Sequence, residues 1–406
     1  MPEEVDLMFA IGLKPEKAIE YFRSKGYAFT WDWHEMLNES HAKAFTVAKA
    51  MRLDILEDIR GMVQKSLDEG ITLRKFQEEL TPKLKAKGWW GPVVGDDGSI
   101  AQLGSPYRLR TIYRTNLQTA YMAGKYKAFV ENADDRPYWQ MVAVMDAATR
   151  PSHARLHGKV FRHDDPFWDK FFPPYEFGCR CTVRPYDAED LAYHGLSVES
   201  SAGKITSEER LVSKKTGIMT TTSVYKDPVT GEKTGTGIGW DYNPGKAAWF
   251  PELDKYDYSV AKNWITGGLT GPGFKAFYEG EIGGNYPVAV LDEEYRNLIG
   301  AKTQTVYLSD WTLKKQKGEV EGYQGHKELT LFDYQKIPEI ISSAEVIIEK
   351  EGYIEVFIKR DKKYYLAAIK TTESKDELYL LSLRKTTKKD IEREMRSGKV
   401  VRNRME

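Results

Sequence analysis

The amino-acid sequence predicts an α+β fold with more than one domain, because helical and strand patterns follow one another along the chain. Its 406 residues are enough for two or three domains with separate cores. Helical spacing of apolar side chains prevails early in the chain, and short alternating strands prevail near its end. We therefore expect a helical N-terminal region (1–106), an α+β core (107–195), a Gly- and Thr-rich arm with an aromatic connector (196–294), and a C-terminal α+β domain (295–406).

Helices account for most of the first 130 residues. Apolar side chains recur at helical spacing from His41 to Glu69, and Gly70 follows where a helix commonly ends. A second helix is expected from its N-cap Thr72 to Leu80, because a proline, Pro82, follows two residues later. A third and longer helix is predicted from Arg108 to Asn132 by its apolar face.

Strands and turns are expected after these helices. The aromatic and β-branched run Tyr138–Met145 predicts a strand that is buried on both faces. The Gly-, Thr- and Lys-rich stretch beyond Ser197 predicts a hairpin or an exposed arm, with its turn at Asp227–Lys233. Aromatic residues from Trp249 to Phe274 lack a clear period, which is typical of a connector that packs onto a neighbouring domain or a partner subunit.

The C-terminal domain is expected to contain short helices followed by strands. Ser309 is placed to cap one helix, Pro338 lies near the start of another, and a basic tail closes the chain. The strand candidates are Glu345–Glu349, Tyr353–Lys359, Lys363–Lys370 and Glu377–Leu383. Because short turns separate them, the pattern predicts a four-stranded antiparallel meander with helices covering one face.

Composition limits the functional classes. The chain has 60 basic and 60 acidic residues, so its net charge gives no indication of nucleic-acid or membrane binding. Two cysteines at C-x-C spacing make an internal disulfide strained, so we expect reduced thiols and synthesis in the cytoplasm. The opening MPEEVDLMFAIG does not resemble a secretory signal, and no apolar run is long enough to span a bilayer.

Residues 145–186 are the richest in specialised side chains. They hold both cysteines and three of the seven histidines. Thiolate and imidazole are preferred zinc ligands, and a structural zinc site needs four ligands. His153, Cys179 and Cys181 could supply three, with the fourth from Asp146, His157 or His163. Two alternatives stay open: small buried residues with local hydrogen bonds, or a cysteine nucleophile with a histidine base.

Several further motifs occur around this segment in a fixed order. They are YRTNLQTAYMAGKYKAF (113–129), RPYWQ (136–140), D..TR..H (146–153), DDPFW (164–168), CRC (179–181) and GWDYNPG (239–245). In these motifs the chain resembles the phage Mu protein F family of minor head proteins, over roughly residues 1–250. The resemblance implies a capsid or head morphogenesis protein of a Mu-like phage or prophage, in the virion head. It would act in head assembly or DNA packaging, with portal and capsid proteins as partners.

The C-terminal domain resembles the nuclease modules of the barnase, EndoU, colicin and RelE-like group that occur in phage proteins. The resemblance rests on VYLSDWTLKKQ (306–316), on DYQKIPEII (333–341), and on a lone histidine and a lysine within a predicted strand. Such RNases use a general acid or base and a cation, without a metal. The implied catalytic residues are His326, with Lys314, Lys370 or Arg384 as the cation and Ser382 or Thr372 as the phosphate-orienting group.

This second resemblance implies an alternative function, that of a head-borne toxin or effector that cleaves RNA. The chain departs from the nuclease pattern, because KKQKG stands where a Lys-His pair is expected. The simpler interpretation is that His326 is an ordinary loop histidine and that the lysines keep the surface soluble.

Overall fold

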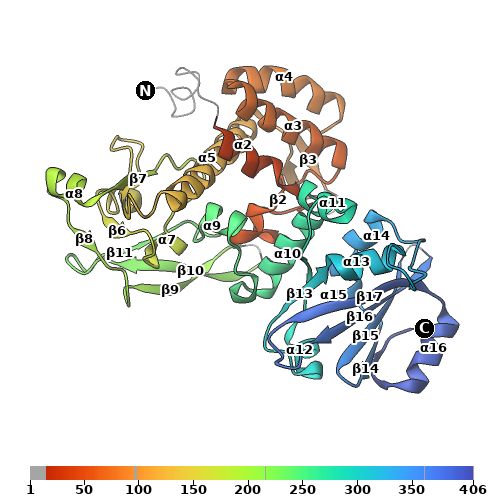
Figure 1. Cartoon of the computed structure of the whole chain (residues 1–406). Coiled ribbons are helices and arrows are strands. Elements are labelled where there is room, and N and C mark those ends of the chain that lie inside the picture. Colours follow the sequence, from red (N-terminus) through yellow and green to blue (C-terminus); the bar gives the residue numbers. More distant parts are fainter. Residues whose placement is uncertain (1–14, 96–97, 215, 361, 406) are drawn as a thin grey trace. The chain divides into compact units, whose positions relative to one another are not determined.

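The computed structural model describes residues 15–95, 98–214, 216–360 and 362–405 (Figure 1). The predicted lack of a secretory signal concerns residues 1–14, outside the described part of the chain. Two compact units make up the chain. Unit 1 comprises Met1–Arg23 and Phe29–Pro251, and unit 2 comprises Ser24–Ala28 and Glu252–Glu406. Helices and strands occur in both units, which confirms the predicted α+β class and the multidomain organisation.

Unit 1 begins with helices and continues with short strands. Its helices are α2 (Glu16–Arg23), η1 (Trp33–Glu35), η2 (Asn38–Ala42), α3 (Leu53–Glu69), α4 (Leu73–Ala86), α5 (Pro106–Glu131), α6 (Pro151–Ala154), α7 (Phe167–Lys170), α8 (Ala188–His194) and α9 (Pro244–Trp249). Its strands are β2 (Ala44–Phe45), β3 (Pro92–Val94), β4 (Ile100–Gln102), β5 (Tyr138–Val142), β6 (Val160–Arg162), β7 (Thr182–Tyr186), β8 (Val198–Glu199), β9 (Ile205–Leu211), β10 (Met219–Lys226) and β11 (Lys233–Gly235).

Two predicted helix limits are wrong by more than one helical turn, and local structure explains both. The first long helix, α3, begins at Leu53 and not at His41, because Lys49 adopts a left-handed φ of 67° that no helix can pass through. Helix α4 continues through Pro82 to Ala86. Pro82 forgoes one helix hydrogen bond, but Leu80 and Leu84 on either side of it are fully buried, so packing sustains the helix.

The predicted helix caps are confirmed. Gly70 ends α3 with a φ of 69°, and its N–H donates to the carbonyl of Ser66. The Thr72 hydroxyl accepts from the Lys75 N–H at the start of α4. The third helix, α5, starts two residues earlier than predicted, at Pro106, because the Ser105 hydroxyl caps it by accepting from Arg108 N–H.

Helices α2 and α5 cross very closely at Gly124. A Cβ atom on this glycine would lie 2.8 Å from the backbone nitrogen of Ala18 and 3.1 Å from the carbonyl carbon of Lys17. Backbone atoms cannot move aside as a side chain can, so only glycine fits here. The AYMAG motif therefore has a structural reason, since its last residue allows helices α2 and α5 to touch.

We expect Gly124→Ala to lower the free energy of unfolding of unit 1 by about 1–3 kcal/mol, as overpacking does. Gly61→Ala is the matched control, because Gly61 is also in a helix interior but nothing lies near its Cβ position. That change should stabilise the unit by up to about 1 kcal/mol through helix propensity. Hydrogen exchange of α2 and α5 peptides in the full-length protein measures both effects. Equal stabilisation by the two substitutions would contradict the close crossing.

The centre of unit 1 is a four-stranded sheet in the order β7-β5-β6-β8. Strand β5 pairs with β6 and β7 in antiparallel fashion, and β6 pairs with β8 in parallel. Trp139 on β5 is fully buried and packs its ring against Trp168 and Phe172. This aromatic core continues without a break to both cysteines, so the predicted α+β core and the Cys-containing segment share one hydrophobic cluster.

The predicted hairpin is present, but it is not an exposed arm. Strands β10 and β11 pair in antiparallel fashion, and the N–H of Asp227 donates to the carbonyl of Glu232 at the turn. Val224 and Tyr225 on β10 are only 1% exposed, and Tyr225 contacts the aromatic ring of Phe161. The local composition indicated the turn, whereas the packing of Tyr225 depends on distant residues and left no pattern in the sequence.

Unit 2 is built around one large sheet. Its helices are η3 (Leu253–Lys255), α10 (Tyr258–Leu269), α11 (Pro272–Glu279), α12 (Glu293–Ile299), α13 (Asp310–Lys317), α14 (Leu331–Gln335), α15 (Ile337–Ser342) and α16 (Lys388–Ser397). Its strands are β1 (Gly26–Tyr27), β12 (Asn285–Val290), β13 (Thr305–Ser309), β14 (Val346–Lys350), β15 (Tyr353–Arg360), β16 (Lys363–Thr371), β17 (Leu378–Thr386) and β18 (Lys399–Asn403).

The sheet has seven strands in the order β12-β13-β17-β16-β15-β14-β18, drawn mainly in blue in Figure 1. The four predicted strands correspond to β14 to β17, which are consecutive antiparallel neighbours at its centre. They do not form a separate four-stranded sheet, because β13 adds in parallel to β17 and β18 adds to β14. The residues expected to be a basic tail instead form helix α16 and strand β18.

Helices cover both faces of this sheet, and not one face as predicted. Ile391 of α16 packs with Val346, Ile348, Phe357 and Leu366 on one face. Helix α15 packs on β15 and β16, with Ile337 and its neighbours fully buried. The predicted cap Ser309 and the early Pro338 lie where expected, at the starts of α13 and α15.

The start of the longer segment of unit 2, Glu252–Glu406, is tied to the sheet by Asp254. Its carboxylate accepts from the N–H groups of Gln304 and Thr305 and from the hydroxyl of Thr305. The unit therefore includes residues from Glu252 onward, whereas the sequence pattern placed a regional limit at 294/295. That limit falls inside helix α12. The limits after residues 106 and 195 stay predictions.

Candidate functional site

The fold brings His153, Cys179 and Cys181 together in unit 1. Strands β5 and β7 are antiparallel, and their last residue pair is Val142 with Thr182. The segment that follows β5 and the segment that precedes β7 therefore lie at the same end of this strand pair. His153 belongs to the short helix α6 that follows β5, and the two cysteines directly precede β7. All three side chains are buried. We call these three residues the Cys–His cluster.

One nitrogen of His153 faces both sulfur atoms. His153 Nδ1 lies 3.5 Å from Cys181 Sγ and 3.8 Å from Cys179 Sγ. The three potential ligand atoms all lie within 4.8 Å of one another. The backbone N–H of Cys181 donates to Cys179 Sγ at 3.4 Å, which stabilises negative charge on that sulfur.

A second layer of side chains holds the histidine ring. His153 Nε2 lies 3.2 Å from Glu176 Oε1, so this carboxylate fixes which ring nitrogen faces the sulfurs. Arg150 in turn lies 2.6 Å from the same Glu176 oxygen and donates to the carbonyl of Phe177. The ring of Tyr175 packs edge-on against the imidazole at 5.3 Å. Glu176 and Tyr175 were not predicted from the sequence, because only the folded loop before Cys179 gives them a role.

The cluster is strongly polarised. Burial opposes a thiolate, but hydrogen bonds from Cys181 and His153 hold the pKa of Cys179 well below its usual value. The pKa of Cys181 is raised because its thiol donates to Cys179 and is buried. Burial lowers the pKa of His153, but the hydrogen bonds to Cys179 and Glu176 outweigh it and raise the pKa to about 9.

The other predicted ligands lie elsewhere. Asp146 is paired with the guanidinium of Arg180, at 2.6 and 2.7 Å, and the hydrogen bonds from Arg180 hold the pKa of this carboxyl well below its usual range. His157 Nδ1 accepts from the N–H of Ala143, and His163 packs against the ring of Trp139. Among the described residues, the group with ligand geometry therefore consists of the Cys–His cluster alone.

A cysteine nucleophile fits this setting poorly. Cys179, Cys181 and His153 are 5%, 2% and 4% exposed, so a substrate cannot reach the sulfur without opening the core. The imidazole nitrogen also lies at similar distances from both sulfurs, 3.5 and 3.8 Å, whereas a nucleophile–base pair needs one directed hydrogen bond. The two readings that the geometry favours are a metal site and a buried hydrogen-bonded cluster.

The predicted RNase residues of unit 2 are spread over the sheet. Ser382 and Arg384 are two residues apart on β17 and share one face, where Arg384 lies 3.9 Å from Glu394 of α16. Lys370 is exposed near the end of β16, where it pairs across the sheet with Tyr353 and Tyr379. Helix α16 therefore covers the face that carries Arg384.

His326 lies at the opposite end of β16 from Lys370. Its ring is 3.9 Å from Glu328, and the carbonyl of Glu328 accepts from Lys385. Lys385, which marks the position of the His326 loop, pairs across the sheet with Tyr365. Tyr365 precedes Lys370 by five residues on β16. Five strand residues span about 16 Å. The structure thus does not bring His326 and Lys370 together, and RNA cleavage stays a prediction.

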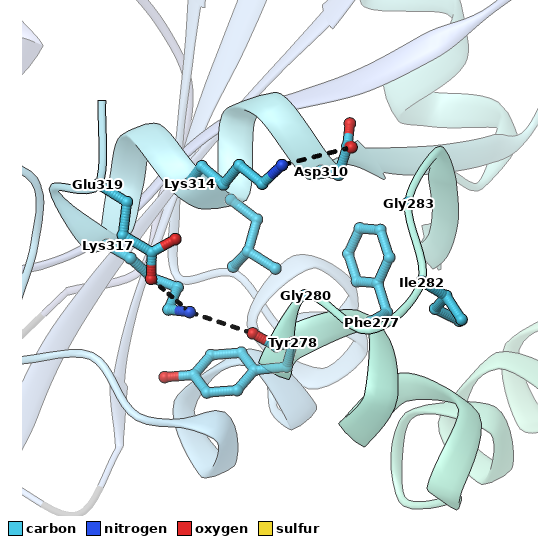
Figure 2. Close-up of a pocket in the computed structure, with 10 residues that line it drawn as sticks. Phe277, Tyr278, Gly280, Ile282, Gly283, Asp310, Lys314, Lys317 and Glu319 are labelled. Atoms are coloured by element: carbon cyan, nitrogen blue, oxygen red, sulfur yellow. Dashed lines mark hydrogen bonds and ion pairs between the residues drawn. The ribbon is translucent and has the colours of Figure 1, made fainter. Parts of the chain in front are cut away.

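Lys314 lines a small cavity between α11 and α13 (Figure 2). The cavity volume is about 30 Å³, and Lys314 lies 3.9 Å from Asp310 on its wall. Lys317 pairs with Glu319 at 2.6 Å and donates to the carbonyl of Tyr278. A space of this size accommodates about one water molecule, so it is too small for a nucleotide. The charges that line it neutralise one another.

None of the described helices is both long and apolar enough to cross a bilayer.

Comparison with known proteins connects the first unit to a phage family. Residues 57–184 match the family described as "Phage Mu protein F like protein". The chain is 45% identical over 255 residues to "Putative capsid assembly protein F" of Escherichia phage Mu, covering 61% of this chain and 58% of that protein. It is 44% identical over 221 residues to "Mu-like prophage FluMu F protein" of Haemophilus influenzae, covering 54% of this chain and 53% of that protein.

The chain thus matches little more than half the length of these two curated relatives. No solved structure matches it. The family match includes all three residues of the Cys–His cluster and lies entirely within unit 1. It does not extend to the nuclease-like region expected after residue 294. The resemblance to the phage Mu protein F family is confirmed, and the chain carries a Mu protein F-like region at residues 57–184.

Proposed function

We propose that this protein acts in head morphogenesis of a Mu-like phage or prophage, as a minor head protein made in the host cytoplasm. The observation that carries the proposal is the 45% identity over 255 residues to a protein named as a putative capsid assembly protein. Identity at this level over a length greater than one domain is expected to preserve the surfaces through which a protein binds its partners. Those partners would be the portal and capsid proteins of the same head.

Unit 1 is the part that we expect to carry the assembly role. It contains the whole matched region, and its core is dense in aromatic side chains that fix a rigid scaffold. Unit 2 has a sheet covered on both faces and a cavity of about 30 Å³ between α11 and α13. We infer that unit 2 serves binding or assembly.

The experiment removes the gene from the phage or prophage that encodes it and supplies the protein in trans. We expect the deletion to abolish infectious particles and to leave aberrant or empty heads by electron microscopy, with intact tails. Full-length chain and Gly61→Ala should restore heads, and Gly124→Val, which disrupts the α2–α5 crossing, should not. Mass spectrometry of purified heads should detect the chain. Normal particle yield from the deletion, with no chain in the heads, would reject the proposal.

A further inference from the structure

The Cys–His cluster has the dimensions of an empty tetrahedral metal site. Zinc binds sulfur at about 2.3 Å and imidazole nitrogen at about 2.0 Å, so tetrahedral geometry separates the two ligand atoms by about 3.5 Å. His153 Nδ1 lies 3.5 Å from one sulfur and 3.8 Å from the other. Both nitrogen–sulfur distances therefore fit a zinc tetrahedron, and the two sulfurs lie within 4.8 Å of each other.

A hydrogen-bonded cluster accounts for this geometry less well. A single N–H on Nδ1 can point at one sulfur only, whereas this nitrogen is nearly equidistant from two. A lone pair on Nδ1 directed at an ion between the sulfurs satisfies all three atoms at once. Two thiolates would also neutralise the divalent ion, which lowers the cost of burying its charge.

The surrounding side chains match those of metal-bound histidines. A histidine that binds metal almost always donates its other ring N–H to a carboxylate or carbonyl. Glu176 accepts from Nε2 here, and Arg150 holds Glu176 in place. The Cys181 N–H that donates to Cys179 Sγ is a further group that stabilises a metal-bound thiolate.

We propose that this protein binds one zinc ion through His153 Nδ1, Cys179 Sγ and Cys181 Sγ, with Glu176 as the positioning residue of the histidine. A water molecule takes the fourth place, because Asp146 is paired with Arg180 and no other described histidine, cysteine or carboxylate joins the group. The ion links α6 to the segment before β7 and so closes a loop of 26 residues between His153 and Cys179. The proposal does not depend on the role in head assembly.

The test measures zinc in the full-length protein, made without a histidine tag in zinc-supplemented medium and purified without chelators. We expect one zinc per chain in wild type and in the controls His157→Ala and Asp146→Asn. Cys179→Ser, Cys181→Ser and His153→Ala should lose it. Glu176→Gln should retain the site but bind zinc about 10–100-fold more weakly, as is usual when a residue that hydrogen-bonds to a metal ligand is replaced.

Cobalt binding gives a second test of the site. It uses the wild-type protein, so it does not depend on whether a substituted protein folds. Apo wild type titrated with Co²⁺ should show an intense charge-transfer band from thiolate to metal, together with the visible bands of tetrahedral cobalt. Folded wild type without bound zinc and without these bands would overturn the proposal and leave a packing cluster. Zinc that persists in Cys181→Ser and His153→Ala would place the ion elsewhere. Zinc loss in Asp146→Asn would overturn this ligand set.

Discussion

Residues 295–406 expressed alone are expected not to fold, whereas residues 252–406 are expected to unfold cooperatively as one domain. The shorter fragment begins inside helix α12 and lacks β12, which pairs with β13. It also lacks α10, whose Ile265 and Leu269 are fully buried in unit 2. The longer fragment keeps all seven strands of the sheet.

The expected difference is large because the second half of β12 and the residue that follows it belong to the core. Val288, Ala289, Val290 and Leu291 are at most 3% exposed. Each fully buried Val or Leu side chain contributes about 1.5–3 kcal/mol, so losing Val288, Val290 and Leu291 costs about 5–9 kcal/mol, which is comparable to the whole stability of an ordinary domain. Removal of β12 also leaves the backbone edge of β13 unpaired, which favours aggregation.

Circular dichroism during heating and the dispersion of amide NMR signals distinguish the two fragments. Limited proteolysis of the full-length protein gives an independent check, with early cleavage expected near Pro251 and a resistant product that begins there. A cooperative melt of the 295–406 fragment, or a stable product of that length, would instead support the limit that the sequence pattern predicts.

The sequence predicts the centre of the large sheet because each strand there carries its own local pattern. Ile354, Val356 and Ile358 alternate with other residues and are all buried on β15. The outer strands lack such patterns. Strand β12 has a register shift at Pro287, and β18 is short and rich in charge. The parallel pairing of β13 with β17 joins residues about 70 positions apart, which no local pattern records.

The residue types of the candidate site were predictable from the sequence, but the positions of the carboxylates around it were not. His153, Cys179 and Cys181 stand out because thiol and imidazole groups are rare in this chain, and they meet in the structure. Glu176 and Asp146 are both ordinary carboxylates in the sequence. Only the fold shows that Glu176 holds the histidine and that Asp146 is occupied by Arg180. His326 and Lys370 were also chosen by type, and the length of β16 keeps them apart.

Asp333→Asn is expected to destabilise unit 2 by roughly 2–3 kcal/mol at neutral pH, because buried donors would lose a charged acceptor. The Asp333 carboxylate is buried at the start of α14. It accepts from the N–H and hydroxyl of Thr330, from the Tyr365 hydroxyl and from Lys385, all within 3.0 Å. These contacts fix α14 to strands β16 and β17.

The same contacts predict how stability changes with pH. Burial raises the pKa of Asp333, but the hydrogen bonds from Thr330, Tyr365 and Lys385 outweigh it and lower the pKa to about 2. An unfolded aspartate titrates near pH 3.9, so the stabilisation is fully present above about pH 4 and is lost as the pH falls towards 2. The destabilisation by Asp333→Asn should therefore shrink between pH 4 and pH 2, where wild type protonates this carboxyl.

Hydrogen exchange of β16 and β17 peptides in the full-length protein measures the opening of unit 2 without interference from unit 1. Asp376→Asn is the matched control, because Asp376 forms a 3.1 Å ion pair with Lys302 at a position that is 58% exposed. Surface pairs of this kind contribute about 0–1 kcal/mol. If the two substitutions have equal effects, or if the effect of Asp333→Asn does not change between pH 7 and pH 3, Asp333 does not hold α14 against the sheet as its contacts indicate.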